Sequence, residues 1–259
     1  NNQNSRLVLS SFFSEINQND LALEILNKNK IKSSSWIISE FEKSYLLEKK
    51  GDYKLAISII EKLSSMNEFK DKALLRISNI YRRNDDFTKS IEILNKIDLS
   101  RKEHPEVYYY KSLNLVLLKD WENAIKSFDI LLKKYPKNPE ISNFVGYTLV
   151  DRNIRLKEGI ELIKYAVSQE PQNGFYLDSL GWAYYKLDEL KKAIVYLERA
   201  IELEPQEMEI NDHLGDAYFR TGRHEEAKLV WERALSLRGD RILVEEIRKK
   251  LEKNFNYKK

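Results

Sequence analysis

Small residues recur along the chain at an almost constant interval, and larger apolar residues follow them at helical spacing. The intervals between successive small residues are 34, 34, 34, 35, 34 and 34. A fixed interval in this range predicts stacked supersecondary units, because a single unit cannot bury its apolar face alone. The small positions are Ala22, Ala56, Ser90, Ala124, Gly159, Ala193 and Ala227, and large apolar residues stand four positions later, as at Leu26, Ile60, Leu94, Phe128, Leu197 and Trp231.

This interval divides the chain into about seven helix–turn–helix repeats. A last segment carries apolar residues at helical spacing with charged residues between them, which predicts a helix that closes the end of the array. We therefore predict an all-α fold, a right-handed α-solenoid with a C-terminal capping helix, as a single domain over 1–259. The predicted repeats are 3–36, 37–70, 71–104, 105–138, 139–173, 174–207 and 208–241, and the predicted capping helix is 242–259.

Composition narrows the picture further. Only 8 glycines and 5 prolines occur. Few residues are therefore available for the tight turns that a β-sheet protein requires. The 44 basic and 41 acidic residues nearly balance, so the net charge gives no argument for nucleic-acid binding. There is no cysteine, so disulfides and thiolate ligands are excluded. No apolar stretch is long enough to span a bilayer, and the opening residues Asn1–Arg6 show no export signal.

Two repeats carry a recognisable motif. The sixth reads Leu180-Gly181-x-x-Tyr184, then Ala193-x-x-x-Leu197-x-x-Ala200, then Pro205; the seventh reads Leu214-Gly215-x-x-Tyr218, then Ala227-x-x-x-Trp231-x-x-Ala234. Both resemble the tetratricopeptide repeat (TPR), and the resemblance extends over essentially the whole chain, with the signature weakening toward the N-terminus. The resemblance implies a surface that binds partner proteins and no catalytic role.

The stretch 143–237 resembles a narrower set of proteobacterial TPR proteins. Its marks are Gly146-Tyr147-Thr148-Leu149, Asp151-Arg152, Leu177-Asp178-Ser179-Leu180-Gly181-Trp182 and His213-Leu214-Gly215-Asp216. Some members of that set are exported lipoproteins that act as adaptors between a processing protease and its cell-wall hydrolase substrates. The resemblance thus implies an adaptor on the periplasmic or envelope side, although the lipobox cysteine of such members is missing here and the cytoplasm stays open.

The family resemblance also implies where a partner binds, because in such solenoids the first helix of each repeat lines the concave face. Trp182, Tyr185 and Asp178 share one helix face, and the next repeat adds Asp212 and Asp216, so we predict an aromatic, acidic patch suited to a basic or amine-bearing peptide. The alternative is that these rings pack against the neighbouring repeat. The further predicted groove residues are Phe219, Tyr147, Asn143, Tyr109, Tyr45 and Phe41.

Lys72 and Arg76 occupy places where TPR chaperone adaptors hold a peptide's terminal carboxylate. The preceding repeats depart from that pattern, with Leu7, Ser11 and Glu42 at the other clamp positions. We therefore expect a basic middle of the groove, with the acidic patch following it, that orients a dipolar peptide through its charges.

Catalytic and metal motifs are absent from the sequence. There is no zinc-binding His-Glu-x-x-His pattern, no phosphate-binding glycine loop and no nucleophile elbow, so we expect no enzyme, cofactor or metal. The alternatives left open are an RNA-binding helical-repeat protein and the regulatory part of a larger enzyme. The expected partner is a protein or peptide, without nucleic acid or membrane insertion, and the sequence leaves open whether two copies pair through an exposed terminal repeat.

Overall fold

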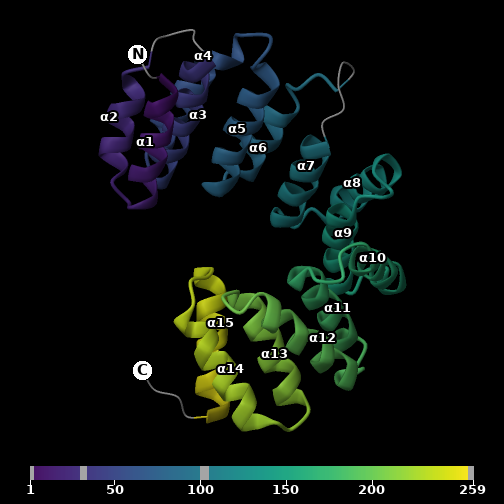
Figure 1. The fold of residues 1–259 in the computed structure, drawn as a ribbon. Helices are drawn as coiled ribbons and strands as arrows, with labels where there is room; N and C mark the ends of the chain where they lie inside the picture. The colour runs from purple at the N-terminus through teal and green to yellow at the C-terminus, as the bar shows by residue number, and fades with distance from the viewer. Residues whose placement is uncertain (1–2, 30–33, 100–104, 256–259) are drawn as a thin grey trace. The chain divides into compact units, whose positions relative to one another are not determined.

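The computed structural model describes residues 3–29, 34–99 and 105–255, and in these ranges the regular structure is entirely α-helical (Figure 1). This confirms the predicted all-α repeat solenoid. The helices are α1 (Gln3–Glu15), α2 (Asn19–Asn27), α3 (Ser34–Lys49), α4 (Tyr53–Ser64), α5 (Lys70–Arg83), α6 (Phe87–Leu94), α7 (Pro105–Leu117), α8 (Trp121–Lys134), α9 (Pro139–Asp151), α10 (Leu156–Gln169), α11 (Gly174–Lys186), α12 (Leu190–Leu203), α13 (Met208–Arg220), α14 (His224–Ser236) and α15 (Arg241–Phe255).

The chain divides into two compact units, residues 1–131 and 132–259, and the division falls within α8. In the first unit α1 packs on α2, α3 on α4 and α5 on α6; in the second α9 packs on α10, α11 on α12 and α13 on α14. The repeat boundaries assigned from the sequence stay a prediction. Helix α15 begins one residue before the predicted capping segment 242–259, and the last four residues of that segment lie outside the described part.

The turn inside each helix pair is built in the same way seven times. The second residue past the end of the first helix takes a positive φ, and the N–H of the residue after it donates to a carbonyl five positions earlier. This is the Schellman ending, which satisfies carbonyls that the helix leaves free. The residues with positive φ at this position are Asn17, Gly51, Asp85, Lys119, Asn153, Asp188 and Gly222.

The turn between α9 and α10 is one residue longer than the turns inside the other pairs, in line with the 35-residue interval in this part of the sequence. After Asn153, a second residue with positive φ follows at Arg155, and α10 begins directly behind it. The Arg155 side chain donates two hydrogen bonds of 2.7 Å to Glu158, in the first turn of α10. The insertion is therefore absorbed locally, and the α9–α10 pairing continues as in the other pairs.

The helices of each pair cross where the small residues lie. A Cβ atom on Gly146 would come within 2.7 Å of the Gly159 carbonyl oxygen, and a Cβ atom on Gly159 within 2.8 Å of the Gly146 carbonyl oxygen. At this crossing α9 and α10 thus meet backbone to backbone. In the last pair the indole of Trp231 occupies the space beside Gly215, where an added Cβ would meet it at 2.4 Å.

The first helices of the second unit form an inner layer. Helix α11 contacts both α9 and α13, and no comparable contact joins α10, α12 and α14 to one another among the described helices. The Tyr147 hydroxyl on α9 even reaches Glu209 on α13, past α11, at 2.8 Å. Within this unit α9, α11 and α13 therefore present one shared face.

Helix α15 covers the end of the second unit. Its Ile247 and Leu251 are fully buried in a core cluster that includes Trp231 and Ala234 of α14. The Phe255 ring lies 6.3 Å from the Trp231 ring, edge to face. The charged residues of α15 between these positions are mostly exposed, as expected of a helix that closes a repeat array.

Gly146→Ala tests the backbone contact between α9 and α10. We expect a loss of about 1–3 kcal/mol in the free energy of unfolding, because the added methyl meets a carbonyl oxygen that cannot rotate away. Urea denaturation followed by circular dichroism measures it. Lys157→Ala, on the exposed side of α10, is the control and should change stability by less than about 0.5 kcal/mol. Equal stability of the two variants would contradict the close approach.

Candidate functional site

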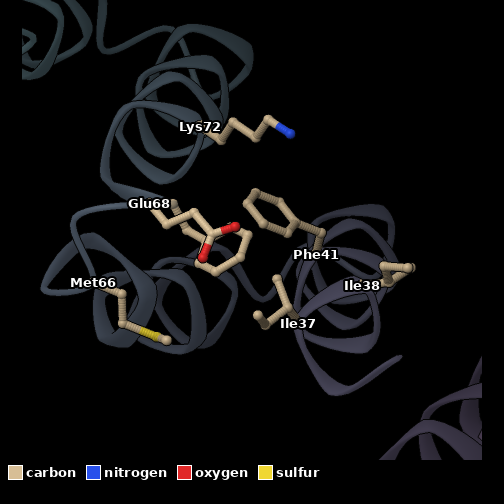
Figure 2. A pocket seen from close by; sticks show the side chains of 7 residues that line it. Ile37, Ile38, Phe41, Met66, Glu68 and Lys72 are labelled. Atoms are coloured by element: carbon tan, nitrogen blue, oxygen red, sulfur yellow. The ribbon is translucent and has the colours of Figure 1, made fainter. Parts of the chain in front are cut away.

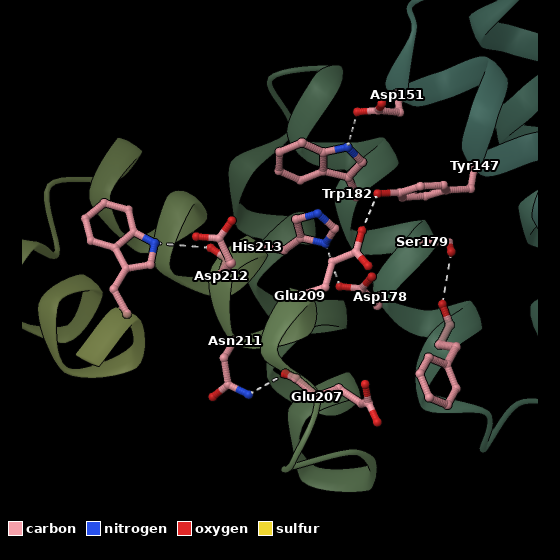
Figure 3. Close-up of polar contacts among 12 residues, drawn as sticks. Tyr147, Asp151, Asp178, Ser179, Trp182, Glu207, Glu209, Asn211, Asp212 and His213 are labelled. Atoms are coloured by element: carbon pink, nitrogen blue, oxygen red, sulfur yellow. Dashed lines mark hydrogen bonds and ion pairs between the residues drawn. The ribbon is translucent and has the colours of Figure 1, made fainter. Parts of the chain in front are cut away.

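Residues from three first helices meet in a polar cluster on the inner face of the second unit (Figure 3). Asp178 on α11 and His213 on α13 lie in contact, with 2.9 Å between Oδ1 and Nδ1. Tyr147 on α9 donates to Glu209, one helical turn before His213. We call these four residues, with Trp182, the inner cluster. The predicted residues Tyr147, Asp178 and Trp182 are thus brought together.

Trp182 lies at the centre of the inner cluster and is 9% exposed. Its ring stacks on His213, with 4.1 Å between centroids, and on Tyr185, with 4.7 Å between centroids. Its indole N–H donates to Asp151 Oδ1 at 3.2 Å, and the Lys186 ammonium lies 5.1 Å from its ring centroid. The ring therefore packs against the neighbouring helix pair, and little of it is exposed.

The carboxylates around His213 keep it charged. Burial on its own lowers the pKa of His213, but the charges of Asp178, Glu209 and Asp212 and the hydrogen bond that His213 donates to Asp178 outweigh it, so the pKa rises to about 9. At neutral pH the imidazolium balances part of the negative charge on this face. Burial and the nearby Glu209 raise the pKa of the Tyr147 hydroxyl, which therefore stays a donor.

The two predicted acidic residues Asp212 and Asp216 are held by a cation from the chain itself. Lys250 on α15 places its Nζ 2.7 and 2.8 Å from the two Asp212 carboxylate oxygens and 2.7 Å from Asp216 Oδ1. Burial and the Asp216 charge raise the pKa of Asp212, whereas Lys250 opposes them. Burial lowers the pKa of Lys250, but the two carboxylates outweigh it and raise that pKa.

The other predicted residues of the second unit lie at the margins of the inner cluster. Phe219 packs edge to face on His224 and Phe255, with 4.7 and 6.2 Å between centroids. Tyr185 is half-buried, and the Arg220 guanidinium lies 5.0 Å from its ring centroid. Asn143 on α9 has a buried Oδ1 without a hydrogen bond.

The predicted residues of the first unit do not form a comparable cluster. Arg76 pairs with the buried Glu48 at 2.6 Å and its Nε donates to Ser44 at 3.2 Å, so its guanidinium is engaged inside the unit. Tyr45 is 46% exposed beside it, with 6.0 Å from the Arg76 guanidinium to the ring centroid. Tyr109 contacts Tyr110 edge to face on α7, and Phe41 and Lys72 line a pocket described below.

The sequence reasoning missed the residues that neutralise the acidic patch. Lys250, Lys186 and Arg220 all cover aromatic or acidic groups predicted for a partner, and the pairing of His213 with Asp178 was not predicted. A signal existed for His213, since its spacing from Glu209 puts both on one helix face. No comparable signal marked Lys250, whose partner Asp212 lies 38 residues earlier.

Two further findings bear on the class of site. Within the described ranges, no group of three or more His, Cys, Asp or Glu residues has the geometry to hold a metal ion. Among the described helices, none combines the length and apolar character needed to cross a membrane.

The charge on His213 predicts a pH dependence of stability. Its folded pKa of about 9 exceeds the ordinary 6.5, so its stabilising contribution is full below about pH 6.5 and disappears as pH rises through 9. Wild type should lose about 3 kcal/mol in the free energy of unfolding between pH 6 and 9.5 relative to His213→Gln, as measured by urea denaturation. His224→Gln, at an exposed histidine, is the control and should follow wild type; parallel curves for all three proteins would contradict the charged state.

Lys250→Met tests the bridge between α15 and α13. We expect a loss of about 3 kcal/mol in the free energy of unfolding at pH 7, because two close carboxylates stay in a largely buried place without a cation. The loss should shrink toward pH 4, where Asp212, whose pKa is already raised, takes up a proton. Thermal denaturation at both pH values measures it, with the exposed Lys253→Met as control. A loss that does not vary with pH would contradict the electrostatic origin.

Family models match two parts of the chain. The model "Psidin, N-terminal TPR repeats region" matches residues 110–233, and the model "Tetratricopeptide repeat" matches residues 41–69. A curated TPR repeat-containing protein of Pseudomonas aeruginosa is 33% identical over 92 residues, which are 34% of this chain. The chain covers 16% of that relative's length.

Solved structures extend the likeness to nearly the whole chain. A tetratricopeptide repeat protein from Parabacteroides merdae has a TM-score of 0.73 at 16% identity, with 95% of this chain and 97% of that chain covered. MamA from Desulfovibrio magneticus has a TM-score of 0.53 at 26% identity, with 65% and 94% covered. The fold is one that proteins use as an interaction scaffold, through the extended surface that stacked repeats create. Together with the repeated helix pairs and their small-residue crossings, these matches confirm that the chain is a tetratricopeptide repeat protein.

Proposed function

We propose that the chain is a scaffold that binds a polypeptide segment of a partner on the shared face of α9, α11 and α13. The hydrogen bond from Tyr147 to Glu209 carries this proposal. It joins the first and third of these helices across the second, so side chains from three consecutive pairs lie within reach of one extended segment. A catalytic role has no support among the described side chains, since the inner cluster consists of stacked rings and paired charges.

The inner cluster is suited to binding because its rings are held in place before a partner arrives. Trp182 is fixed by stacking on two rings and by its hydrogen bond to Asp151. Ordering side chains at an interface costs about 0.5–1.5 kcal/mol for each one immobilised. Rings that are already fixed avoid most of that cost, which is why preorganised aromatic residues make effective contacts.

The surface around the inner cluster determines what a partner contacts first. Phe175 on α11 is 48% exposed, Glu209 is exposed and Tyr185 is half-buried. Asp178 and Asp212 are buried and already paired with His213 and Lys250. We therefore propose that the partner's apolar side chains contact Phe175 and Tyr185, and that a basic residue pairs with Glu209. Binding through Asp212 and Asp216 would require a partner's amine to displace Lys250.

The finer role that the sequence supports is that of an adaptor. The motifs in 143–237 resemble proteobacterial TPR proteins that bring a protease to envelope substrates, and a face open to an extended polypeptide is what such an adaptor needs. We propose this role for the second unit. The proposal is separate from the choice of binding face, because an adaptor that uses another face would still hold two partners at once.

Substitutions on the shared face test the proposal. Peptides selected on wild type from a phage-displayed random library should bind Phe175→Ala and Glu209→Lys at least about tenfold more weakly by fluorescence polarisation, because apolar area and one charge pair are lost. Glu225→Lys, with the same charge change on the outer helix α14, is the matched control for Glu209→Lys and should bind as wild type does. Val195→Ala, at a 63% exposed position on α12, is the matched control for Phe175→Ala and should also bind as wild type does.

Circular dichroism should show the same helicity in all five proteins. If every selected peptide binds the four variants equally well, the shared face of α9, α11 and α13 is not the binding surface.

A further inference from the structure

The first unit contains an apolar pocket between α3 and the start of α5 (Figure 2). Helix α3 supplies one wall, and the turn between α4 and α5 supplies the other. The pocket has a volume of about 660 Å³, which is room for a bulky side chain. Its apolar lining consists of Ile37, Ile38, Phe41, Met66 and Phe69, and the charged residues Glu68 and Lys72 complete it.

The pocket is left open by the packing beneath it. Phe41, Met66 and Phe69 rest partly on a buried cluster that contains Leu63 and Ile77, and none of them closes the space between the two walls. Ile38 stays 49% exposed at its edge. Apolar surface that remains in contact with water in this way gains stability when another apolar group covers it. The thioether of Met66 lets one wall adjust to the shape of what enters.

The two charged residues indicate what kind of group lies beside the entering side chain. Figure 2 shows the Lys72 ammonium and the Glu68 carboxylate on the α5 side of the pocket, opposite Phe41 and Ile37. Lys72 is exposed, and no hydrogen bond or ion pair engages it or Glu68 within the described part of the chain. In contrast, Arg76, one turn after Lys72, forms an ion pair with Glu48. Lys72 is therefore the cation here that is available to a partner.

The choice between an acidic and a basic partner follows from the neighbourhood of Lys72. It stands in the first turn of α5, a helix of 14 residues whose N-cap residue, Phe69, makes no side-chain capping hydrogen bond. The backbone N–H groups at a helix N-terminus favour negative charge, and they reinforce Lys72. Glu68, and Asp71 in the first turn of α5, oppose a second carboxylate beside the one that pairs with Lys72, so one acidic residue beside one apolar residue is the complementary pattern.

We propose that this pocket receives a bulky apolar side chain of a polypeptide partner, and that an acidic residue next to it in the partner pairs with Lys72. The inference rests on the proposed function in that the partner is a polypeptide. It concerns a different unit of the chain, however, and a different set of contacts.

Selection against a pocket variant tests this inference on the full chain. A phage-displayed random library is depleted on Ile38→Asp and then selected on wild type. The enriched peptides should carry Leu, Ile, Phe, Met or Trp next to Asp or Glu. Their affinity by fluorescence polarisation should fall about tenfold or more in Ile38→Asp and in Lys72→Glu. Since both positions are exposed, circular dichroism should show both variants folded.

A charge exchange provides the sharpest control. A peptide whose acidic residue is replaced by Lys should bind Lys72→Glu better than it binds wild type, and Glu68→Lys should bind the acidic peptide at least as well as wild type does. Val195→Asp, at an exposed apolar position of the second unit, should leave the affinity unchanged. Glu209→Lys should do the same, which separates this pocket from the face proposed above.

Several outcomes would overturn the proposal. These are no enrichment at all, enrichment of basic residues beside the apolar one, and peptides whose binding is insensitive to Ile38→Asp and Lys72→Glu. Self-association of wild type that Ile38→Asp abolishes in light scattering would assign the pocket to a second copy of the chain. Loss of binding in Glu209→Lys alone would remove the pocket while supporting the proposed function. Loss in the pocket variants alone is the expected result, and the shared face is tested separately by the peptides selected on wild type without depletion.

Discussion

Close approach of two helices is the constraint on which the second unit depends. Gly146 and Gly159 bring α9 and α10 together through their backbones, and at the next crossings Gly181 and Gly215 take up Leu197 and Trp231. Since each second helix is held tightly against its own first helix, the first helices are free to contact one another along the inner layer. The inner cluster lies in that layer, so its geometry follows from crossings some distance away from it.

The chain also neutralises its own buried charges. Asp178 is met by the charged His213, and Asp212 and Asp216 by Lys250. Removing carboxylates from water without such partners would be strongly unfavourable, which explains why cations from neighbouring pairs and from α15 converge there. As a result, the formal charges of the first helices overstate the negative charge that a partner meets.

Sequence periodicity was sufficient for the fold and insufficient for the site. Ala22, Ala124 and Ala227 marked the repeat interval, and all three are fully buried, because close packing of the helices tolerates only small residues there. The same periodicity placed Trp182 and Asp178 on one face. It did not show that Trp182 stacks on His213, or that Lys250 reaches Asp212, because the angles between pairs depend on packing in three dimensions. Neither did it reveal the pocket beside Ile38, which arises from a space between walls.

The seven Schellman endings have a consequence for how the chain is made. Each one closes a helix pair through a hydrogen bond between residues five positions apart, as between Asp86 and Tyr81 or Glu189 and Tyr184. Contacts so close in sequence form quickly, because little chain entropy is lost in making them. A pair can therefore assemble on the ribosome soon after its own residues emerge, and each newly synthesised pair finds the previous one already in place as a template.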